Sequence, residues 1–385
     1  MPRHVFHGRK RSLRELPELN PTLKYTATYF DASVHEPERL GLDVLADGLR
    51  ATPEARAANY VEAVGARDGA VILRDRETGT EFGMRARVVV NASGPWTDLT
   101  NGTLGESSAL MGGTKGSHIV LDHPELFAAC DDRELFFENG DGRIVLIHPL
   151  KGRVMVGTTD LDADPREPAL CTEDEVDYFF DLVSHVFPTI VVDRSQIVYR
   201  FAGIRPLPRH DDTQPGFVSR DYRVVPGRID TLPGTELLSL VGGKWTTFRA
   251  LGERLADDVL ALLGRQRTVV DGQPRDRRRG RIPPHRQERA AWVEQHRGTA
   301  TPARAEQLLE RYGTRAAEVL DGIDPAKDRP LENDPEFSTG ELRHIAAQES
   351  VVHLIDVVLR RTNHAFTGAI SPQLLAEFSE LTARP

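Results

Sequence analysis

A glycine pair followed by cationic and hydroxyl side chains is the strongest ligand-binding candidate in this chain. The segment follows the strand-like apolar run 236–241 and opens a helix-like stretch that continues to Leu263. Adjacent glycines at a strand-to-helix turn let backbone N–H groups approach a ligand, and a helix N-terminus favours an anion. A tight turn with a helix cap explains the same residues. The residues concerned are Gly242, Gly243, Lys244, Trp245, Thr246 and Thr247.

A second segment of small residues follows the apolar run Val88-Val89-Val90. It continues from Asn91 through Ala92 and Gly94 to Trp96 and Asp98. A solid apolar run is typical of a strand buried on both faces of a parallel sheet. Such a strand brings its following loop against a ligand at the carboxyl edge of the sheet. A plain strand-to-helix loop is the alternative interpretation.

Lys115 and His118 flank a single glycine near the predicted strand 117–121. Because side chains alternate along a strand, His118 can project into a cleft, where a neutral imidazole can accept a proton. Histidine also has many structural uses, so the residue type alone leaves both roles open.

Two arginines lie near a second pair of predicted strands. Arg205 stands in a Gly-X-Arg-Pro turn after strand 196–200, and Arg220 follows a short loop later. Two guanidinium groups on adjacent strands suit a planar anion such as a carboxylate or a phosphate. Asp221 and Tyr222 are nearer polar partners for Arg220, whereas the turn itself does not require Arg205.

The hydrophobic pattern predicts the elements that position these residues. Residues 1–23 are basic and irregular in pattern, and residues 264–287 are rich in arginine and proline, which is typical of a solvated linker. The predicted strands are 23–31, 56–66, 70–75, 83–91, 117–121, 134–138, 143–148, 153–158, 196–200 and 217–225. The four from 117–121 to 153–158 are expected to form an antiparallel sheet. The predicted helices are 37–49, 173–186, 302–312, 314–320 and 338–361.

Composition excludes several classes of protein. The 385 residues carry a net charge of −9, which gives no electrostatic reason to expect nucleic-acid binding. Cys130 and Cys171 have no metal-ligand spacing and suit a reducing compartment. No apolar run is long enough to span a bilayer, and the first residues lack a signal-peptide core. We therefore expect a cytoplasmic chain whose contact with the inner face of the cell membrane, if it has one, is peripheral.

Taken together and in order, these segments make the chain resemble the FAD-dependent, quinone-linked glycerol-3-phosphate dehydrogenases. These enzymes fall within the flavin-dependent amine and hydroxy-acid oxidase superfamily. The resemblance runs from Leu23 to the C-terminal helices, where residues 356–362 also fit. The motifs that carry it are NASGPWTD, KGSHIVLD, GRVMVGTTD, FAGIRPL followed by SRDY, and GGKWTTFR.

The resemblance implies an α/β fold with three parts: a doubly wound, Rossmann-like FAD-binding domain that is incomplete at its N-terminus, an antiparallel-sheet substrate domain, and a C-terminal helical domain. It assigns residues 1–263 to the oxidoreductase domain, with the substrate sheet at about 20–35 and 110–225. Residues 264–287 form the linker and residues 288–385 the helical domain. The implied partners are glycerol 3-phosphate and a membrane quinone as electron acceptor. The resemblance is also compatible with a homo-oligomer.

The resemblance also implies roles for individual residues. His118 and Arg205 match residues beside the reacting carbon of the substrate. Arg205, Arg220, Lys244 and Lys115 match substrate contacts, and the turn 157–160 matches a structural signature. The residues that match the FAD site are Val61, Ala92, Gly94, Trp96, Gly243, Lys244, Thr246 and Thr247.

The chemistry of alcohol oxidation independently requires such a set. A base must take the hydroxyl proton, and a flavin must accept the hydride from carbon. His118 suits the first role, and cationic Arg205 can stabilise charge on the alcohol oxygen. A phosphate far from the reacting carbon supplies binding energy for orientation.

One feature of the family pattern is missing, because the sequence contains no GxGxxG turn for the FAD pyrophosphate. Losing the central first strand would leave strand edges without partners. We therefore expect the chain, expressed alone, to bind FAD poorly or to aggregate. A misassigned start, a degraded gene and a separate polypeptide that supplies this half are three open explanations.

Two other functions remain open from the sequence. The chain could be another superfamily flavoenzyme that acts on an amino or hydroxy acid, although three cations fit a dianion better than a single carboxylate. It could also be an inactive relic without cofactor.

Overall fold

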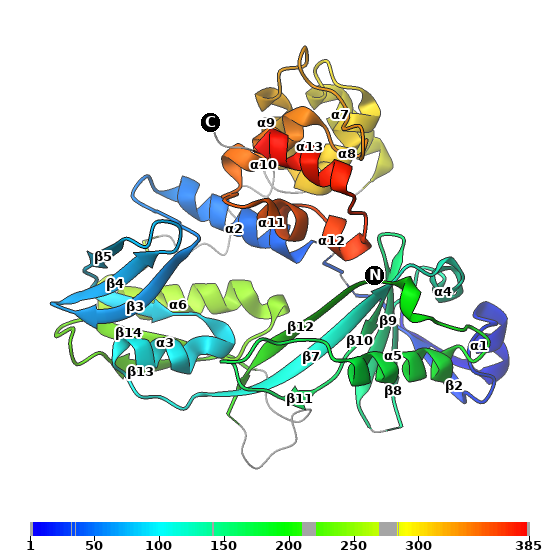
Figure 1. The fold of residues 1–385 in the computed structure, drawn as a ribbon, viewed down its shortest axis with the longest axis horizontal. Helices are drawn as coiled ribbons and strands as arrows, with labels where there is room; N and C mark the ends of the chain where they lie inside the picture. Colours follow the sequence, from blue (N-terminus) through cyan, green and yellow to red (C-terminus); the bar gives the residue numbers. More distant parts are fainter. Residues whose placement is uncertain are drawn as a thin grey trace. The chain divides into compact units, whose positions relative to one another are not determined.

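The computed structural model describes residues 3–31, 33–34, 36–140, 142–209, 221–268, 283 and 285–382. The chain divides into two compact units (Figure 1). The first unit consists of Met1–Ala32 and Tyr60–Thr268, and the second of Ser33–Asn59 and Val269–Pro385. The prediction of one continuous domain over 1–263 differs from this division, since residues 33–59 group with the C-terminal helices.

The first unit contains an antiparallel sheet, here called the large sheet, as the alternating pattern predicts. Strand β7 is central: β12 pairs along one edge, and β10 and β11 follow one another along the other. Beyond β10 the order continues through β9 to β8. The strands are β7 (Met111–Leu121), β8 (Leu135–Glu138), β9 (Ile144–Leu150), β10 (Arg153–Gly157), β11 (Leu161–Asp162) and β12 (Ile197–Pro208).

One face of the large sheet is covered by helix α5 (Glu173–Val186), and α4 (Pro124–Cys130) and the short helix η2 (Arg194–Gln196) lie in neighbouring connections. Helix α5 has the predicted bounds and begins with a capping box between Thr172 and Glu175. Its apolar side chains pack on the alternate strand residues that point towards it. The fully buried members of this core include Ile119, Leu121, Ile147, Val154, Val156, Phe179 and Val183.

A smaller three-stranded sheet in the same unit has the order β13-β14-β6, and the pairing of β14 with β6 is parallel. The parallel pairing confirms the interpretation of the valine run, but Val90 is 39% exposed. The expected burial on both faces is therefore wrong, because β6 lies at the edge of this sheet among the described residues. The elements are β6 (Val88–Asn91), η1 (Gly94–Trp96), α3 (Thr97–Leu104), β13 (Arg223–Arg228), β14 (Glu236–Val241), η4 (Trp245–Thr247) and α6 (Phe248–Leu262).

Two further groups of strands complete the first unit. A three-stranded antiparallel meander packs against α3 and β14 through an apolar core around Leu104 and Leu237. The N-terminal segment, expected to be irregular up to residue 23, instead forms a hairpin-like pair of strands around a basic helix. Ser12 Oγ lies 3.1 Å from the carbonyl of His7 and 2.8 Å from Thr26 Oγ1, which ties this helix to both strands. The elements are β1 (Val5–Gly8), α1 (Arg9–Glu15), β2 (Tyr25–Thr28), β3 (Val61–Arg67), β4 (Ala70–Asp75) and β5 (Glu81–Met84).

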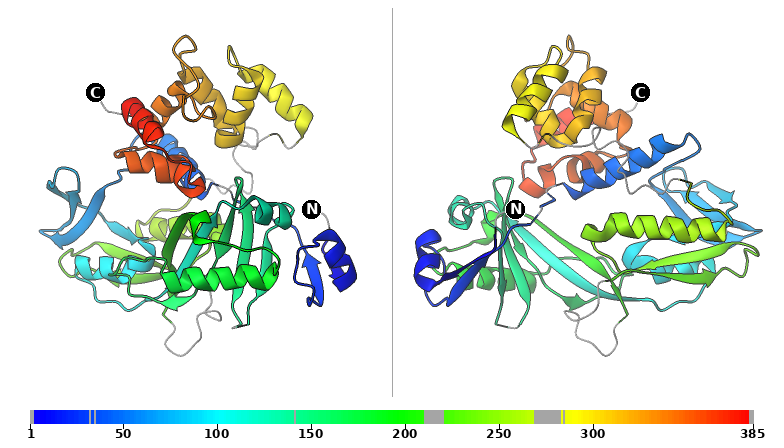
Figure 2. Two further views of the ribbon diagram at one scale, coloured as in Figure 1. Left: turned by 45° about the vertical axis from the view of Figure 1, so that its right-hand side comes forward. Right: turned by 180° about the vertical axis from the view of Figure 1, so that it is seen from behind.

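The second unit is helical, as predicted, and includes α2 from the N-terminal half of the chain (Figure 2). The single helix expected over 338–361 is wrong. A break at residues 349–353 interrupts it, where Ser350 has a positive φ of 52°. The elements are α2 (Pro37–Ala51), α7 (Arg286–His296), α8 (Pro302–Tyr312), η5 (Gly313–Arg315), α9 (Ala316–Gly322), α10 (Thr339–Gln348), α11 (Leu354–Asp356), the π-helical η6 (Val357–Arg361), α12 (His364–Thr367) and α13 (Pro372–Thr382).

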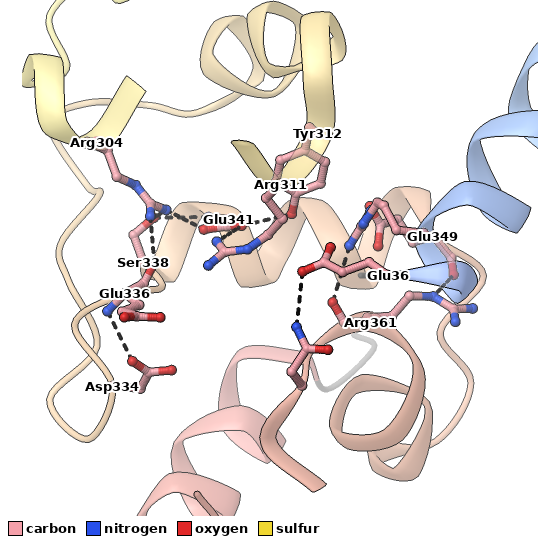
Figure 3. Close-up of polar contacts among 12 residues, drawn as sticks. Glu36, Arg304, Arg311, Tyr312, Asp334, Glu336, Ser338, Glu341, Glu349 and Arg361 are labelled. Carbon is pink, nitrogen blue, oxygen red and sulfur yellow. Dashed lines mark hydrogen bonds and ion pairs between the residues drawn. The ribbon is translucent and has the colours of Figure 1, made fainter. Parts of the chain in front are cut away.

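A buried charge network holds these helices together (Figure 3). Glu341, at the start of α10, accepts hydrogen bonds from Arg304, from Arg311 at 2.5 Å and from the Tyr312 hydroxyl at 2.9 Å. Arg39 of α2 pairs with Glu349, and its guanidinium lies 4.5 Å from the centre of the Tyr312 ring. Helix α2 is thus attached to the C-terminal helices by a buried ion pair.

Candidate functional site

The two glycine-containing turns predicted from sequence lie at the same edge of the small sheet. Strands β6 and β14 are parallel neighbours, with Val88 opposite Glu236 and Asn91 opposite Ser239. Their carboxyl ends therefore lead side by side into the segments that begin at Ala92 and at Gly242. This edge is where ligands bind in open parallel sheets.

The backbone of both turns adopts conformations that favour glycine. Gly94 has φ of 62°, Gly242 of 76° and Gly243 of 111°. A β-carbon at Gly242 would also lie only 2.8 Å from the carbonyl oxygen of Asp221 and 3.5 Å from Pro208, the last residue of β12. The glycine pair therefore allows the turn to lie against the end of the strand that carries Arg205.

A buried amide network fixes the turn after β6. Asn91 Nδ2 donates to the Thr97 carbonyl at 2.9 Å and to Asn101 Oδ1 at 2.6 Å, and Asn101 Nδ2 donates to Ser239 Oγ at 3.0 Å. Asp98 accepts the backbone N–H groups of Leu110 and Met111 at 2.9 Å, which sets the start of β7. The sequence did not single out Asn101 as a positioning residue. Asn101 could have been recognised as a second asparagine ten residues after Asn91, on the buried side of α3.

The other predicted FAD-site residues are accessible to a ligand. Trp96 is 49% exposed and donates its indole N–H to the Pro165 carbonyl at 2.9 Å, and Lys244 and Thr246 are exposed. Thr247 donates its hydroxyl to the Lys244 carbonyl at 3.1 Å. Val61 begins β3, opposite Asp75. An apolar pocket of about 360 Å³ lies beside β6 and is lined by residues such as Ala63, Leu73, Met84, Val88, Val90, Ala92 and Leu104.

His118 and Arg205 lie on the face of the large sheet opposite to α5, here called the open face because α5 does not cover it. His118 on β7 pairs with Phe201 on β12, and the two rings stack with centres 4.9 Å apart. Arg205, four residues further along, lies within β12 and not in the turn predicted after residue 200, because the strand continues to Pro208. It is on the same side as His118 because strand side chains alternate. The structure thus brings the two predicted catalytic residues together.

Two glycines make room for these side chains. A β-carbon at Gly116 would overlap the Arg205 guanidinium, and one at Gly157 would overlap the His118 ring. The guanidinium therefore crosses β7 above Gly116 and reaches the turn after β10. There Arg205 donates to Asp160 Oδ1 at 2.9 Å, to Thr158 Oγ1 at 2.9 Å and to the Thr159 carbonyl at 3.0 Å.

The electrostatics of this face favour a neutral histidine. Burial, and secondly the positive charge of Arg205, lower the pKa of His118 to about 4. Its Nδ1 atom is buried and has no hydrogen-bond partner among the described residues. At neutral pH the imidazole is thus uncharged, and a substrate that brings negative charge would make it a stronger base.

Lys115 does not join His118 and Arg205. Alternation along β7 turns it to the other face, where its ammonium donates to Glu175 at 2.8 Å and to the Leu170 carbonyl at 2.7 Å. Arg220, the remaining predicted phosphate contact, lies outside the described residues.

Comparison with known families shows the family to which the chain belongs. Residues 7–258 match the family described as FAD dependent oxidoreductase, so the chain belongs to that family, as the resemblance predicted. Residues 234–384 match the C-terminal domain of alpha-glycerophosphate oxidase. The family and the helical C-terminal match confirm the predicted fold class.

Individual relatives bear related names. The chain is 30% identical over 362 residues to a glycerol-3-phosphate dehydrogenase of Synechocystis sp., covering 88% of this chain but only 64% of that relative. It is 28% identical to the D-erythritol 1-phosphate dehydrogenase of Brucella abortus, covering 92% of this chain and 71% of that protein. The crystal structure of glycerol-3-phosphate dehydrogenase from Bacillus halodurans with FAD has the same fold. Its TM-score is 0.73 at 22% identity, over 98% of this chain and 75% of that one.

Proposed function

We propose that this chain carries the substrate site and part of the cofactor site of an FAD-dependent dehydrogenase that oxidises sn-glycerol 3-phosphate to dihydroxyacetone phosphate. The observation that supports this best is the pairing of a neutral imidazole with a fixed guanidinium on one open sheet face. The names of the Synechocystis and Bacillus relatives agree with it.

The residues divide the reaction between them. His118 takes the proton of the secondary hydroxyl group, and Arg205 holds that oxygen and stabilises the charge that develops on it. Lys244 and Arg220 are proposed to bind the phosphate, which orients the alcohol against His118. Lys115 is left out of this set because it faces α5.

The chain's residues fit an FAD along the edge where β6 and β14 end. Gly94, Gly242 and Gly243 allow a close approach of the backbone, and exposed Trp96 and Lys244 offer an aromatic surface and a cation. When bound there, FAD would supply the hydride acceptor.

A polyol phosphate longer than glycerol phosphate is a second candidate substrate. The Brucella relative is named for erythritol phosphate and aligns with 92% of this chain. The same base, guanidinium and phosphate contacts would serve either alcohol, so only the space beyond the reacting carbon distinguishes them.

Transfer of electrons to a membrane quinone, and a peripheral membrane contact, remain part of the proposal. No described helix has the length and apolar character needed to cross a membrane. The Arg275–Arg281 run, the contact predicted from sequence, lies outside the described residues. Another candidate is the N-terminal hairpin, where Phe6 is 76% and Tyr25 66% exposed. The same N-terminal segment carries the exposed cations Arg3, Arg9, Lys10, Arg11, Arg14 and Lys24.

An absorbance spectrum recorded without oxygen tests the proposed reaction. The chain alone is expected to hold little FAD, so it is first incubated with excess FAD. We expect the flavin spectrum of the reconstituted chain to bleach when glycerol 3-phosphate is added. Bleaching by erythritol phosphate alone would move the assignment to the longer polyol. Bleaching only by an amino or hydroxy acid would refute the phosphate site and support the alternative superfamily activity.

A further inference from the structure

The turn after β10 is bonded on both faces of the large sheet. On the open face, the carbonyl of Thr159 accepts a hydrogen bond from Arg205 at 3.0 Å. On the α5 face, the hydroxyl of the same residue donates to Glu175 Oε1 at 2.6 Å and accepts the backbone N–H of Ser117 at 3.0 Å. One residue thus connects a buried carboxylate to the guanidinium.

Glu175 has more partners than a helix cap requires. It is 3% exposed and forms a buried ion pair with Lys115 at 2.8 Å. It also accepts the backbone N–H of Thr172 at 2.8 Å, as part of the capping box. Burial alone would raise its pKa, but hydrogen bonds from Lys115 and Thr159 outweigh burial and lower the pKa to about 2. The carboxylate is therefore a charged, fixed acceptor for Thr159 at all ordinary pH values.

The guanidinium depends on this turn for its position. It reaches across β7 above Gly116, where it has room only because that residue lacks a β-carbon. The groups named above from Thr158, Thr159 and Asp160 then determine where its plane lies. A shift of the Thr159 peptide would move the guanidinium relative to His118.

We propose that Glu175 and Thr159 are positioning residues for Arg205, acting through the hydrogen bond between them. The role rests on the proposed function, because Arg205 acts on substrate only if that function holds. Lys115 contributes by keeping Glu175 charged without touching the open face.

The experiment compares two threonines that both bond Glu175. Thr159→Val removes the hydroxyl that fixes the turn, and Thr159→Ser keeps it. Thr172→Val is the matched control, since its hydroxyl lies 3.2 Å from Glu175 Oε2 but belongs to the helix cap. Glu175→Gln tests the acceptor itself. Thermal unfolding of all four variants shows which remain folded.

Nuclear magnetic resonance titration of the His118 ring is the first readout, because the Arg205 charge contributes to its low pKa. We expect the midpoint of the His118 titration to rise in Thr159→Val and in Glu175→Gln. It should stay near the wild-type value in Thr159→Ser and in Thr172→Val. An unchanged midpoint in Thr159→Val would overturn the proposal, as would an equal shift in Thr172→Val.

Steady-state kinetics with glycerol 3-phosphate is the second readout. We expect kcat to fall about tenfold or more in Thr159→Val, as for other small misplacements of a catalytic group, and to be restored in Thr159→Ser. An equal fall in Thr172→Val would mean a merely structural role. If the wild-type protein reconstituted with FAD shows a bound-flavin spectrum but does not oxidise this substrate, the proposed function fails. The ring titration, which needs no FAD, still decides whether Thr159 and Glu175 position Arg205.

Discussion

Two buried glutamates, one in each unit, have similar partners but different surroundings. Glu175 in the first unit and Glu341 in the second are 3% and 0% exposed, and each binds a cation and a hydroxyl group. The partners of Glu341 all belong to the interior of the helical unit. One partner of Glu175, Thr159, continues to a guanidinium on an open sheet face. A buried carboxylate enclosed like Glu341 stabilises the fold. One connected like Glu175 also determines the geometry of a site.

Removing the enclosed glutamate should give the largest effect on stability. Glu341→Ala leaves Arg304 and Arg311 buried without their counter-ion, and breaking a buried pair in this way costs about 3–5 kcal/mol. Urea unfolding of the second unit measures the loss. Glu310→Ala on the exposed side of α8 is the control, because its partner Arg289 lies 3.8 Å away at the surface. Equal losses of unfolding free energy in the two variants would contradict the stabilising role assigned to the buried glutamate.

Removing the guanidinium on the open face should instead affect catalysis. Arg205→Ala is expected to lower kcat/KM for glycerol 3-phosphate by a factor on the order of 100 to 1000, because a charged donor near the reacting oxygen is lost. Its effect on unfolding should be smaller than that of Glu341→Ala, since the side chains of Arg205 and its partner Asp160 are each 23% exposed, whereas that of Glu341 is fully buried. Turnover close to wild type would exclude Arg205 from the reaction.

A methyl group placed beneath the guanidinium should have an intermediate effect. Gly116→Ala puts a β-carbon into the Arg205 side chain, and we expect about a tenfold loss of kcat. Gly203 is the cross-strand partner of Gly116, and a β-carbon there meets no atom within 4 Å. Gly203→Ala is therefore the control and should retain activity. If both variants behave alike, the space above Gly116 is unimportant.

The last expected effect is on the pH dependence of stability, to which His118 contributes. Its pKa is about 4 in the folded chain, against an ordinary value of 6.5. Between these values the unfolded chain binds a proton that the folded chain does not, so stability should fall as pH decreases from 6.5 to 4. Urea unfolding across this range should show a shallower pH dependence in His118→Phe. An identical slope in both proteins would show that His118 titrates normally.

Much of the first unit could be predicted from local patterns. The alternating runs gave the strands of the large sheet, and helix α5 has its predicted bounds because Thr172 and Glu175 form a recognisable cap. The placement of Lys115 could not be predicted from a motif, since one residue of register decides which face it occupies. The unit to which α2 belongs could not be predicted from the sequence either. It depends on the long-range pair between Arg39 and Glu349, which no local pattern reveals.

The attachment of α2 also determines how this protein can be divided. Because residues 33–59 group with the C-terminal helices, the chain passes between the units three times. A deletion after residue 268 would not yield an intact first unit. It would leave a tethered helix whose buried Arg39 has lost its partner Glu349. To obtain the first unit alone, the chain must end at residue 268 and a short linker must replace residues 33–59.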